Sequence, residues 1–297
     1  MPEALEVFDW GGRKTLWIDS ERIDECLSYY REHGLDGIGV NPLHGYKASD
    51  LSFLRDHPYV TGLVVVPSTR TIDLAGIEKL KELRYLSISE TRQPLSLEEF
   101  PKLEEFRGDW HAGLEIGPRC PALRVLQLWH YRPKSLDLGE LPELPRLGEL
   151  GLTQSPLLSL SGLARFSGLR RLELAHLAKL ESIHPAEELP ELGELDCHTC
   201  RKLKDHERIA KSKTLKSLRY NNCGSLPSLR FLRQMPELEE FRFVNTEVRD
   251  GDMTPLFGLM HVGFVGKKRY SHTPEQVDAV LRKKGGSAIP RLEEGGA

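Results

Sequence analysis

The stretch 169–200, LRRLELAHLAKLESIHPAEELPELGELDCHTC, decides the fold because it contains one motif twice. LRRLEL begins at Leu169 and LGELDC begins at Leu192, so residues at positions one, four and six return after 23 residues. In a β-strand alternate side chains point to opposite faces, so positions four and six share one buried face. A fixed period of this length is typical of repeats that bury their leucines only against their neighbours.

The same motif continues outward from this stretch through most of the chain. Successive copies begin 20 to 25 residues apart. Proline often stands two residues before a copy, where it ends the preceding segment because it cannot continue a helix. The first positions are Leu35, Val60, Leu83, Leu103, Leu123, Leu147, Leu169, Leu192, Leu215, Leu238 and Leu259.

With its ninth position included, this pattern resembles the leucine-rich-repeat family, in the short class of about 22 residues and the bacterial intracellular type. The resemblance implies an α/β solenoid: a leucine-rich-repeat horseshoe with a curved parallel β-sheet of about eleven strands and helical N- and C-terminal caps. The family uses the ninth position to close the turn after each strand. Leu43, Leu177 and Lys267 depart from it. Elsewhere it falls on Ser68, Thr91, His111, Tyr131, Ser155, Cys200, Cys223 and Thr246.

The repeats divide the chain into four predicted parts. Residues 1–34 are expected to form an N-terminal cap of a strand pair and a helix, and residues 35–267 the solenoid. Thr273-Pro274-Glu275-Gln276 is a capping-box sequence and predicts a C-terminal cap helix within 268–285. Residues 286–297 are expected to be a flexible tail.

Composition favours a folded cytoplasmic protein. Apolar residues make up 39% of the chain, and the net charge of −3 comes from 41 basic and 44 acidic residues. This balance gives no argument for nucleic acid or for an anionic membrane. The five cysteines, without a predicted signal peptide, favour reduced thiols, and no run of apolar residues is long enough to span a membrane.

Positions three, five and seven of each repeat should point into the concave face of the sheet. In the first two repeats these positions hold glycine and valine, so the varied polar surface begins at the third repeat. Acidic residues exceed basic ones on it, which predicts a partner with a basic patch. The candidate contact residues are Tyr85, Glu105, Arg107, Asp109, Trp110, Gln127, Trp129, Glu149, Arg171, Glu173, Glu194, Asp196, Arg219 and Arg242.

Trp110 and Trp129 are candidate anchors for a partner, because tryptophan and arginine dominate binding hot spots. The alternative is that one or both rings tuck under a neighbouring loop, since tryptophan is commonly mostly buried. The sequence leaves both interpretations open.

Two patterns that suggest chemistry have simpler explanations. Cys197 and Cys200, with Cys223 and His206 nearby, suggest a zinc half-site, but the three cysteines occupy regular repeat positions. Three histidines near one rim, close to carboxylates, suggest acid–base chemistry, but no nucleophile or closed pocket accompanies them. We therefore expect no catalytic residue, no metal and no cofactor. The histidines are His130, His176 and His198, with Asp109 and Glu173 as the carboxylates.

These features predict a non-catalytic scaffold that binds another protein through the concave face, without nucleic acid or membrane as partner. Two alternatives follow from the resemblance: an immunity or inhibitor protein that neutralises a toxin or effector, and a substrate-recruiting adaptor of an enzyme complex. The repeat motif specifies the fold and does not distinguish among them.

Overall fold

The computed structural model describes residues 4–66 and 71–289. The predicted turn residue Ser68 and the tail residues 290–297 lie outside this range. The chain divides into two compact units, Met1–Trp129 and His130–Ala297, here called unit 1 and unit 2.

Unit 1 begins with an antiparallel hairpin and continues as parallel strands. β1 pairs with β2, and the sheet then runs β2-β3-β4-β5-β7-β9 with every later pair parallel. The short strands β6 and β8 pair separately. The elements are β1 Val7–Trp10, β2 Arg13–Trp17, α1 Ile23–Glu32, β3 Gly37–Val40, η1 Pro42–His44, η2 Ser52–Asp56, β4 Gly62–Val65, η3 Ile77–Lys79, β5 Tyr85–Ile88, β6 Leu95–Ser96, η4 Leu97–Glu99, β7 Glu105–Asp109, β8 Leu114–Glu115 and β9 Val125–Trp129, where η marks a 3₁₀ helix.

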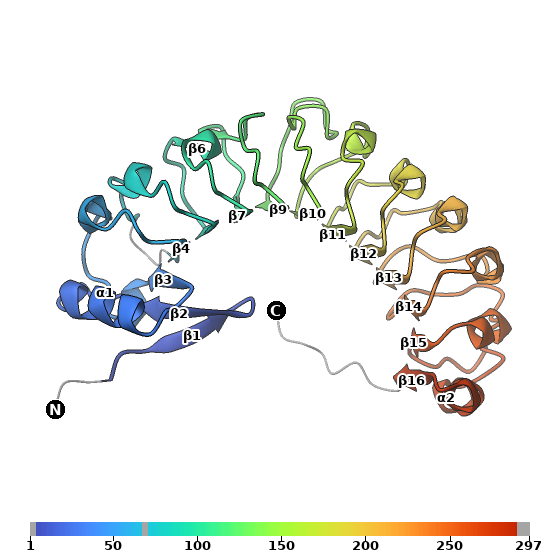
Figure 1. Ribbon diagram of the computed structural model, residues 1–297. Coiled ribbons are helices and arrows are strands. Elements are labelled where there is room, and N and C mark those ends of the chain that lie inside the picture. Colours follow the sequence, from blue (N-terminus) through green and yellow to red (C-terminus); the bar gives the residue numbers. More distant parts are fainter. Residues whose placement is uncertain (1–3, 67–70, 290–297) are drawn as a thin grey trace. The chain divides into compact units, whose positions relative to one another are not determined.

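Unit 2 consists of parallel strands in chain order from β10 to β16. Its 3₁₀ helices lie on the outer side of the strands and leave the other sheet face uncovered (Figure 1). The elements are β10 Glu149–Thr153, η5 Leu163–Arg165, β11 Arg171–Ala175, η6 Ala186–Glu188, β12 Glu194–His198, η7 His206–Lys211, β13 Ser217–Asn221, η8 Arg230–Gln234, β14 Glu240–Arg242, η9 Thr254–Gly258, β15 His261–Gly263, α2 Pro274–Leu281, η10 Arg282–Lys284 and β16 Ser287–Ile289.

The predicted core columns are confirmed. Leu150, Leu172, Leu195 and Leu218 stand in register on neighbouring parallel strands, and each is at most 1% exposed. Burying a leucine side chain of this kind stabilises the fold by about 1.5–3 kcal/mol. A strand starts close behind each of the eleven predicted motif positions, so the leucine pattern identified every repeat strand.

In three consecutive repeats of unit 2, the ninth position closes the turn by bonding to the repeat before it. The Cys200 thiol donates to the carbonyl of Leu174 at 3.4 Å, and the Cys223 thiol donates to that of Cys197 at 3.2 Å. The hydroxyl of Thr246 donates in the same way to the carbonyl of Tyr220. These buried donors satisfy carbonyls that would otherwise lack a partner in the core.

The eighth position has a backbone conformation that the motif did not predict. In seven repeats it is a non-glycine residue with φ between 52° and 57°, a left-handed conformation that turns the chain out of the strand. These residues are Glu90, His130, Gln154, His176, Thr199, Asn222 and Asn245.

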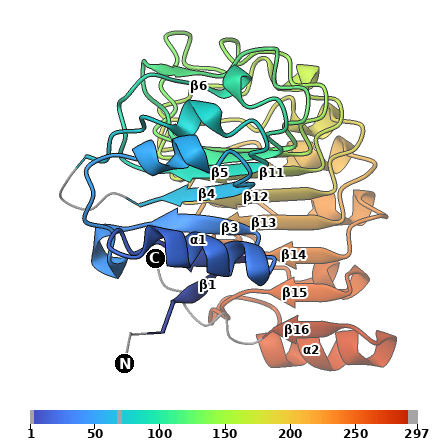
Figure 2. The ribbon, with the colours of Figure 1, turned by 60° about the vertical axis from the view of Figure 1, so that its left-hand side comes forward.

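At its C-terminal end unit 2 has the expected capping helix and an unexpected strand. Thr273 accepts a hydrogen bond from the backbone of Gln276, and the Gln276 side chain bonds back to Thr273, so the predicted capping box starts α2. β16, which pairs in parallel with β15, lies at the start of the segment expected to be a flexible tail. α2 packs alongside β16 (Figure 2). No apolar alternation in these few residues signalled a strand.

Candidate partner-binding face

The candidate site is the sheet face that carries positions three, five and seven, which we call the concave face. In unit 1 the first two repeats carry glycines on this face, and the side chain of Tyr85 from β5 lies across Gly37 and Gly62. A Cβ atom at Gly62 or at Gly37 would come within 2.0 Å of the Tyr85 side chain. Burial raises the pKa of Tyr85 to about 12, so the hydroxyl stays protonated. Tyr85 was a predicted contact residue, but it is only 4% exposed and covers the glycines instead.

A second aromatic group covers Gly39. A Cβ atom there would come within 2.5 Å of Trp17, whose ring stacks on Phe8 at 3.8 Å between centroids. His44 also stacks on Trp17, at 4.6 Å. Trp10 meets Phe8 edge-on at 6.2 Å. This cluster places half-buried aromatic residues on the concave face, at the hairpin β1–β2, within the segment predicted to form the N-terminal cap.

Arg13 of β2 links the hairpin to β7. It donates to Glu105 at 2.5 Å although 92 residues separate them, and its guanidinium lies 4.8 Å from the centre of the Tyr85 ring. Arg107 donates to the other oxygen of Glu105 and, at 2.7 Å, to Gln127 of β9. Three predicted contact residues, Glu105, Arg107 and Gln127, thus belong to one hydrogen-bond network. Glu105 itself is 5% exposed, so its carboxylate serves the two arginines.

The remaining candidates of unit 1 lie at the C-terminal ends of β7 and β9. Asp109, Trp110 and Trp129 are all half-buried. The backbone N–H of Trp110 donates to the carbonyl of Trp129 at 2.8 Å, and Asp109 accepts from the backbone of Glu90 at 2.7 Å. Both tryptophans are thus partly covered and partly accessible to a partner.

In unit 2, four charged side chains form a ladder across β12, β13 and β14. Arg219 lies 3.5 Å from both Asp196 and Glu240, and Arg242 also pairs with Glu240. Burial raises the pKa of Asp196, with Arg219 opposing part of this effect. Burial also acts to raise the pKa of Glu240, but Ser217 and the two arginines outweigh it and hold that pKa below its usual value. Most of the charge in this ladder is therefore internally compensated.

The neighbouring strands β10 and β11 carry the uncompensated charge. Arg171 pairs with Glu194 at 3.1 Å. Among the described residues, no cation lies within ion-pair distance of Glu149 or Glu173. Gly151 stands in register with Glu173, so no side chain separates the latter from β10. These two carboxylates are available to an incoming group.

A shallow hollow of about 450 Å³ lies where β11 to β15 begin. Its walls are polar and mixed in charge, which suits a protein side chain better than a closed small-molecule pocket. It is lined by Arg170, Glu191, Gly193, Glu194, Thr214, Lys216, Ser217, Glu239, Glu240 and His261.

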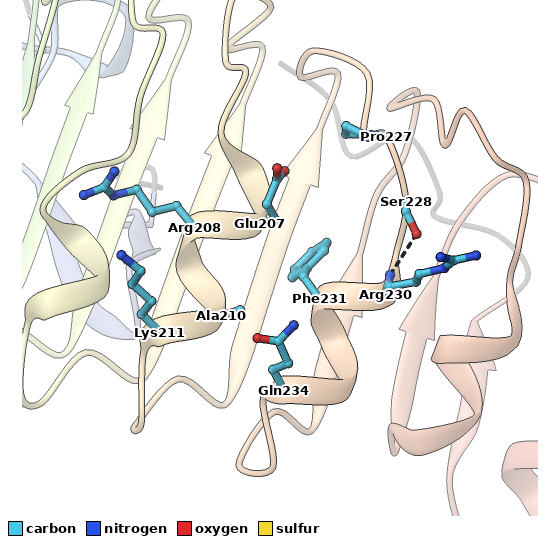
Figure 3. Close-up of a pocket in the computed structure, with 9 residues that line it drawn as sticks. All are labelled: Glu207, Arg208, Ala210, Lys211, Pro227, Ser228, Arg230, Phe231 and Gln234. Atoms are coloured by element: carbon cyan, nitrogen blue, oxygen red, sulfur yellow. Dashed lines mark hydrogen bonds between the residues drawn. The ribbon is translucent and has the colours of Figure 1, made fainter.

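A second groove of about 420 Å³ lies on the outer side, between η7 and η8. Figure 3 shows Phe231 and Gln234 beside the groove, whereas Arg208 and Lys211 point away from Phe231. Because the cations do not converge, this groove has no evident anion site.

The suspected zinc pattern is explained by the repeat. Cys197, Cys200 and Cys223 are buried free thiols, and the last two donate to backbone carbonyls. Within the described residues, one group has metal-like spacing: His184, Glu187 and Glu188 on the outer side. No sequence motif had indicated this group of three residues. Arg208 bonds both Glu187 and His184, so a guanidinium already neutralises the buried carboxylate.

No protein-family model and no curated protein match this chain. Its structure is similar to that of the internalin InlF from Listeria monocytogenes, with a TM-score of 0.56 and 14% identity over 94% of this chain and 87% of the internalin. The functional domain of InlJ from the same organism has a TM-score of 0.48 and 14% identity, over 76% of this chain and 54% of that one. The predicted leucine-rich-repeat solenoid is confirmed at the level of the fold. Among the described residues, no helix is both long and apolar enough to cross a membrane.

Proposed function

We propose that this leucine-rich-repeat solenoid is a non-catalytic scaffold that binds another protein on its concave face. The observation that carries the proposal is the division of strands β10 to β14: positions four and six are buried, while the charged side chains at positions three and five are at least partly exposed on a rigid sheet. Side chains fixed on neighbouring strands lose little freedom on binding, which favours tight recognition.

The charge of the unit 2 face supports a partner with a basic patch. Positions three and five of β10 to β14 carry five carboxylates against three guanidinium groups. Two of these carboxylates, Glu149 and Glu173, have no ion pair within residues 4–66 and 71–289. A lysine or arginine of the partner would complete this arrangement, because complementary charge steers encounter and fixes register. The residues counted are Glu149, Glu173, Glu194, Asp196 and Glu240, and Arg171, Arg219 and Arg242.

We further propose the cytoplasm as the location. All five cysteines are buried free thiols, as expected of a protein that stays in a reducing compartment. The short repeat class and the bacterial intracellular type belong to the same proposal. They rest on the repeat spacing and on the stretch KKRYSH at 267–272, which resembles the closing segment of bacterial intracellular leucine-rich-repeat proteins.

The test is capture of a partner from the native lysate, with identification by mass spectrometry. We expect Trp129→Ala and Glu194→Lys to reduce capture, and Glu173→Lys to reduce it most because it reverses an unpaired charge. Glu207→Lys is the matched control, since Glu207 is exposed on the outer side of η7. If capture is unaffected by every substitution on the concave face, the face is not the binding site.

A further inference from the structure

We propose that the concave face of unit 1 is an anchor for a segment in which an acidic residue lies next to an aromatic or large apolar residue. The inference rests on the proposed function and deepens it, because it assigns a partner chemistry to unit 1 that differs from that of unit 2. It also assigns a binding role to the N-terminal hairpin.

The hairpin presents two aromatic rings in a fixed position. Phe8 and Trp10 lie on the face that also carries Arg13 and Thr15, because Phe8 pairs with Thr15 and Trp10 pairs with Arg13 across the two strands. Both rings are half-buried, so each has surface left to cover. Aromatic side chains of this kind dominate binding energy because they bury a large area and have few rotatable bonds.

Two features hold these rings before any partner arrives. The turn that joins β1 to β2 is Gly11-Gly12, with φ of 60° and 85°, which is the conformation that two-residue hairpin turns require. Behind them, Trp17 stacks on Phe8 and is itself 8% exposed, so the pair has a rigid support. A preformed aromatic surface loses little entropy on binding.

The guanidinium groups beside the rings carry an unbalanced positive charge. Arg13 and Arg107 share one carboxylate, that of Glu105, so the three side chains together carry a net charge of one positive unit. Arg13 uses only Nη2 in this contact, and Arg107 uses Nε and Nη1. Both side chains are about one-third exposed, at 33% and 30%. Within the described part of the chain, N–H groups of both therefore remain for a carboxylate of the partner.

These observations select one occupant. A basic segment would add a third cation beside two that share one anion, and a purely apolar segment would leave the guanidinium donors facing it without partners. A carboxylate beside a ring satisfies both halves of the surface. Arg13 is the junction, since it pairs with Trp10 across the hairpin and with Glu105 on β7.

The test uses a fluorescein-labelled peptide, EEFEEFE, with QQFQQFQ and KKFKKFK as its neutral and basic counterparts, and measures binding by fluorescence anisotropy. We expect the acidic peptide to bind at least about tenfold more tightly than the neutral one, because charge-assisted hydrogen bonds to arginine are lost in the latter. The basic peptide should bind most weakly. Equal binding of the three peptides, or no binding of the acidic one, would overturn the proposal.

Variants of the protein give the second arm. Trp10→Ser and Arg107→Gln should each weaken binding of EEFEEFE by about tenfold, and Arg107→Lys should restore part of it. Val7→Ser and Lys14→Gln are matched controls, because both residues lie on the opposite face of the same hairpin and are exposed. Melting followed by circular dichroism would be used to check that each variant is folded. Unchanged binding in folded Trp10→Ser protein contradicts the proposal.

The outcome is separable from that of the proposed function. If Glu173→Lys abolishes partner capture while Trp10→Ser and Arg107→Gln leave both capture and peptide binding intact, the scaffold function stands and this anchor is wrong. If no concave variant affects capture but the peptide results are as expected, the anchor stands and the function needs another partner.

Discussion

The hydroxyl of Tyr85 lies 2.9 Å from that of Thr15, both buried, although β3 and β4 lie between their strands. This contact is possible only because Gly37 and Gly62 leave the concave face of the intervening strands open to the ring. The bare glycine positions of the first repeats are thus part of the packing.

We therefore predict that Gly62→Ala destabilises the protein by about 1–3 kcal/mol, the usual cost of forcing extra atoms into a packed region. The added methyl group would meet the Tyr85 ring at 2.0 Å. Urea unfolding measures the change. Gly258→Ala is the control, because a Cβ atom at that position meets nothing within 4 Å. Equal stability of the two variants would contradict the packing of Tyr85.

The leucine columns give a second prediction. Leu172→Ala should lower the free energy of unfolding by about 2–5 kcal/mol, because it leaves a cavity in the centre of the core. Leu158→Ala removes the same atoms from a side chain that is 54% exposed, so its effect should stay within about 0.5 kcal/mol. Chemical denaturation followed by circular dichroism compares them. A cost for Leu158→Ala as large as that for Leu172→Ala would argue against the core assignment.

A buried histidine gives a prediction for pH. His206 is fully buried, neither ring nitrogen has a hydrogen-bond partner among the residues that the structure describes, and burial lowers its pKa to about 4. The unfolded chain binds this proton near pH 6.5, before the folded protein does, so folding stability should fall as pH drops from about 6.5 toward 4. Between pH 6.5 and 5 the histidine contributes a loss of about 1.6 kcal/mol.

His206→Phe removes this contribution and places a ring of similar shape against Tyr220, whose ring centroid is 5.0 Å from that of His206. The difference in unfolding free energy between wild type and variant should therefore change with pH over this range, with the wild type losing more. Urea titrations at several pH values measure it. Parallel pH dependence of the two proteins would show that His206 does not titrate in this range.

The left-handed turn position gives a fourth prediction. His176 has φ of 57°, in the left-handed region. This conformation costs free energy for most residues other than glycine, and the cost is smaller for asparagine. His176→Asn should stabilise unit 2 by about 0.5–1 kcal/mol. His198→Asn, one position earlier in its repeat and inside strand β12, is the control and should not stabilise. Thermal melting compares the two, and a gain in both would remove the backbone explanation.

The sequence predicted the features that repeat and missed those that occur once. The positions of Leu172 and Leu195 predict their strands because their spacing recurs throughout the chain. The contact of Arg13 with Glu105 could not be found this way, since it joins residues far apart in sequence and Arg13 lies before the first repeat. The left-handed eighth position was also missed, although it recurs, because residues as different as Glu90, His176 and Asn245 occupy it.

For the candidate site, the repeat pattern predicted which residues form the columns on the concave face, but not which of their charges are paired. Glu194 and Glu173 look alike in the motif, yet one is paired with Arg171 and the other has no ion pair among the described residues. Pairing depends on which side chains of adjacent strands meet, and the repeat spacing does not encode their rotamers. The acidic excess was visible in the sequence, and its location at β10 and β11 required the structure.

The bonds of the ninth position have a consequence for how such a chain changes length. Cys200, Cys223 and Thr246 each reach a carbonyl 26 residues earlier, in the preceding repeat. A duplication or deletion of one whole repeat keeps every such bond, whereas the loss of a few residues breaks the bond on both sides of the cut. Unit 2 can therefore gain or lose whole repeats, and an engineered chain with one repeat doubled should keep these hydrogen bonds between neighbouring repeats.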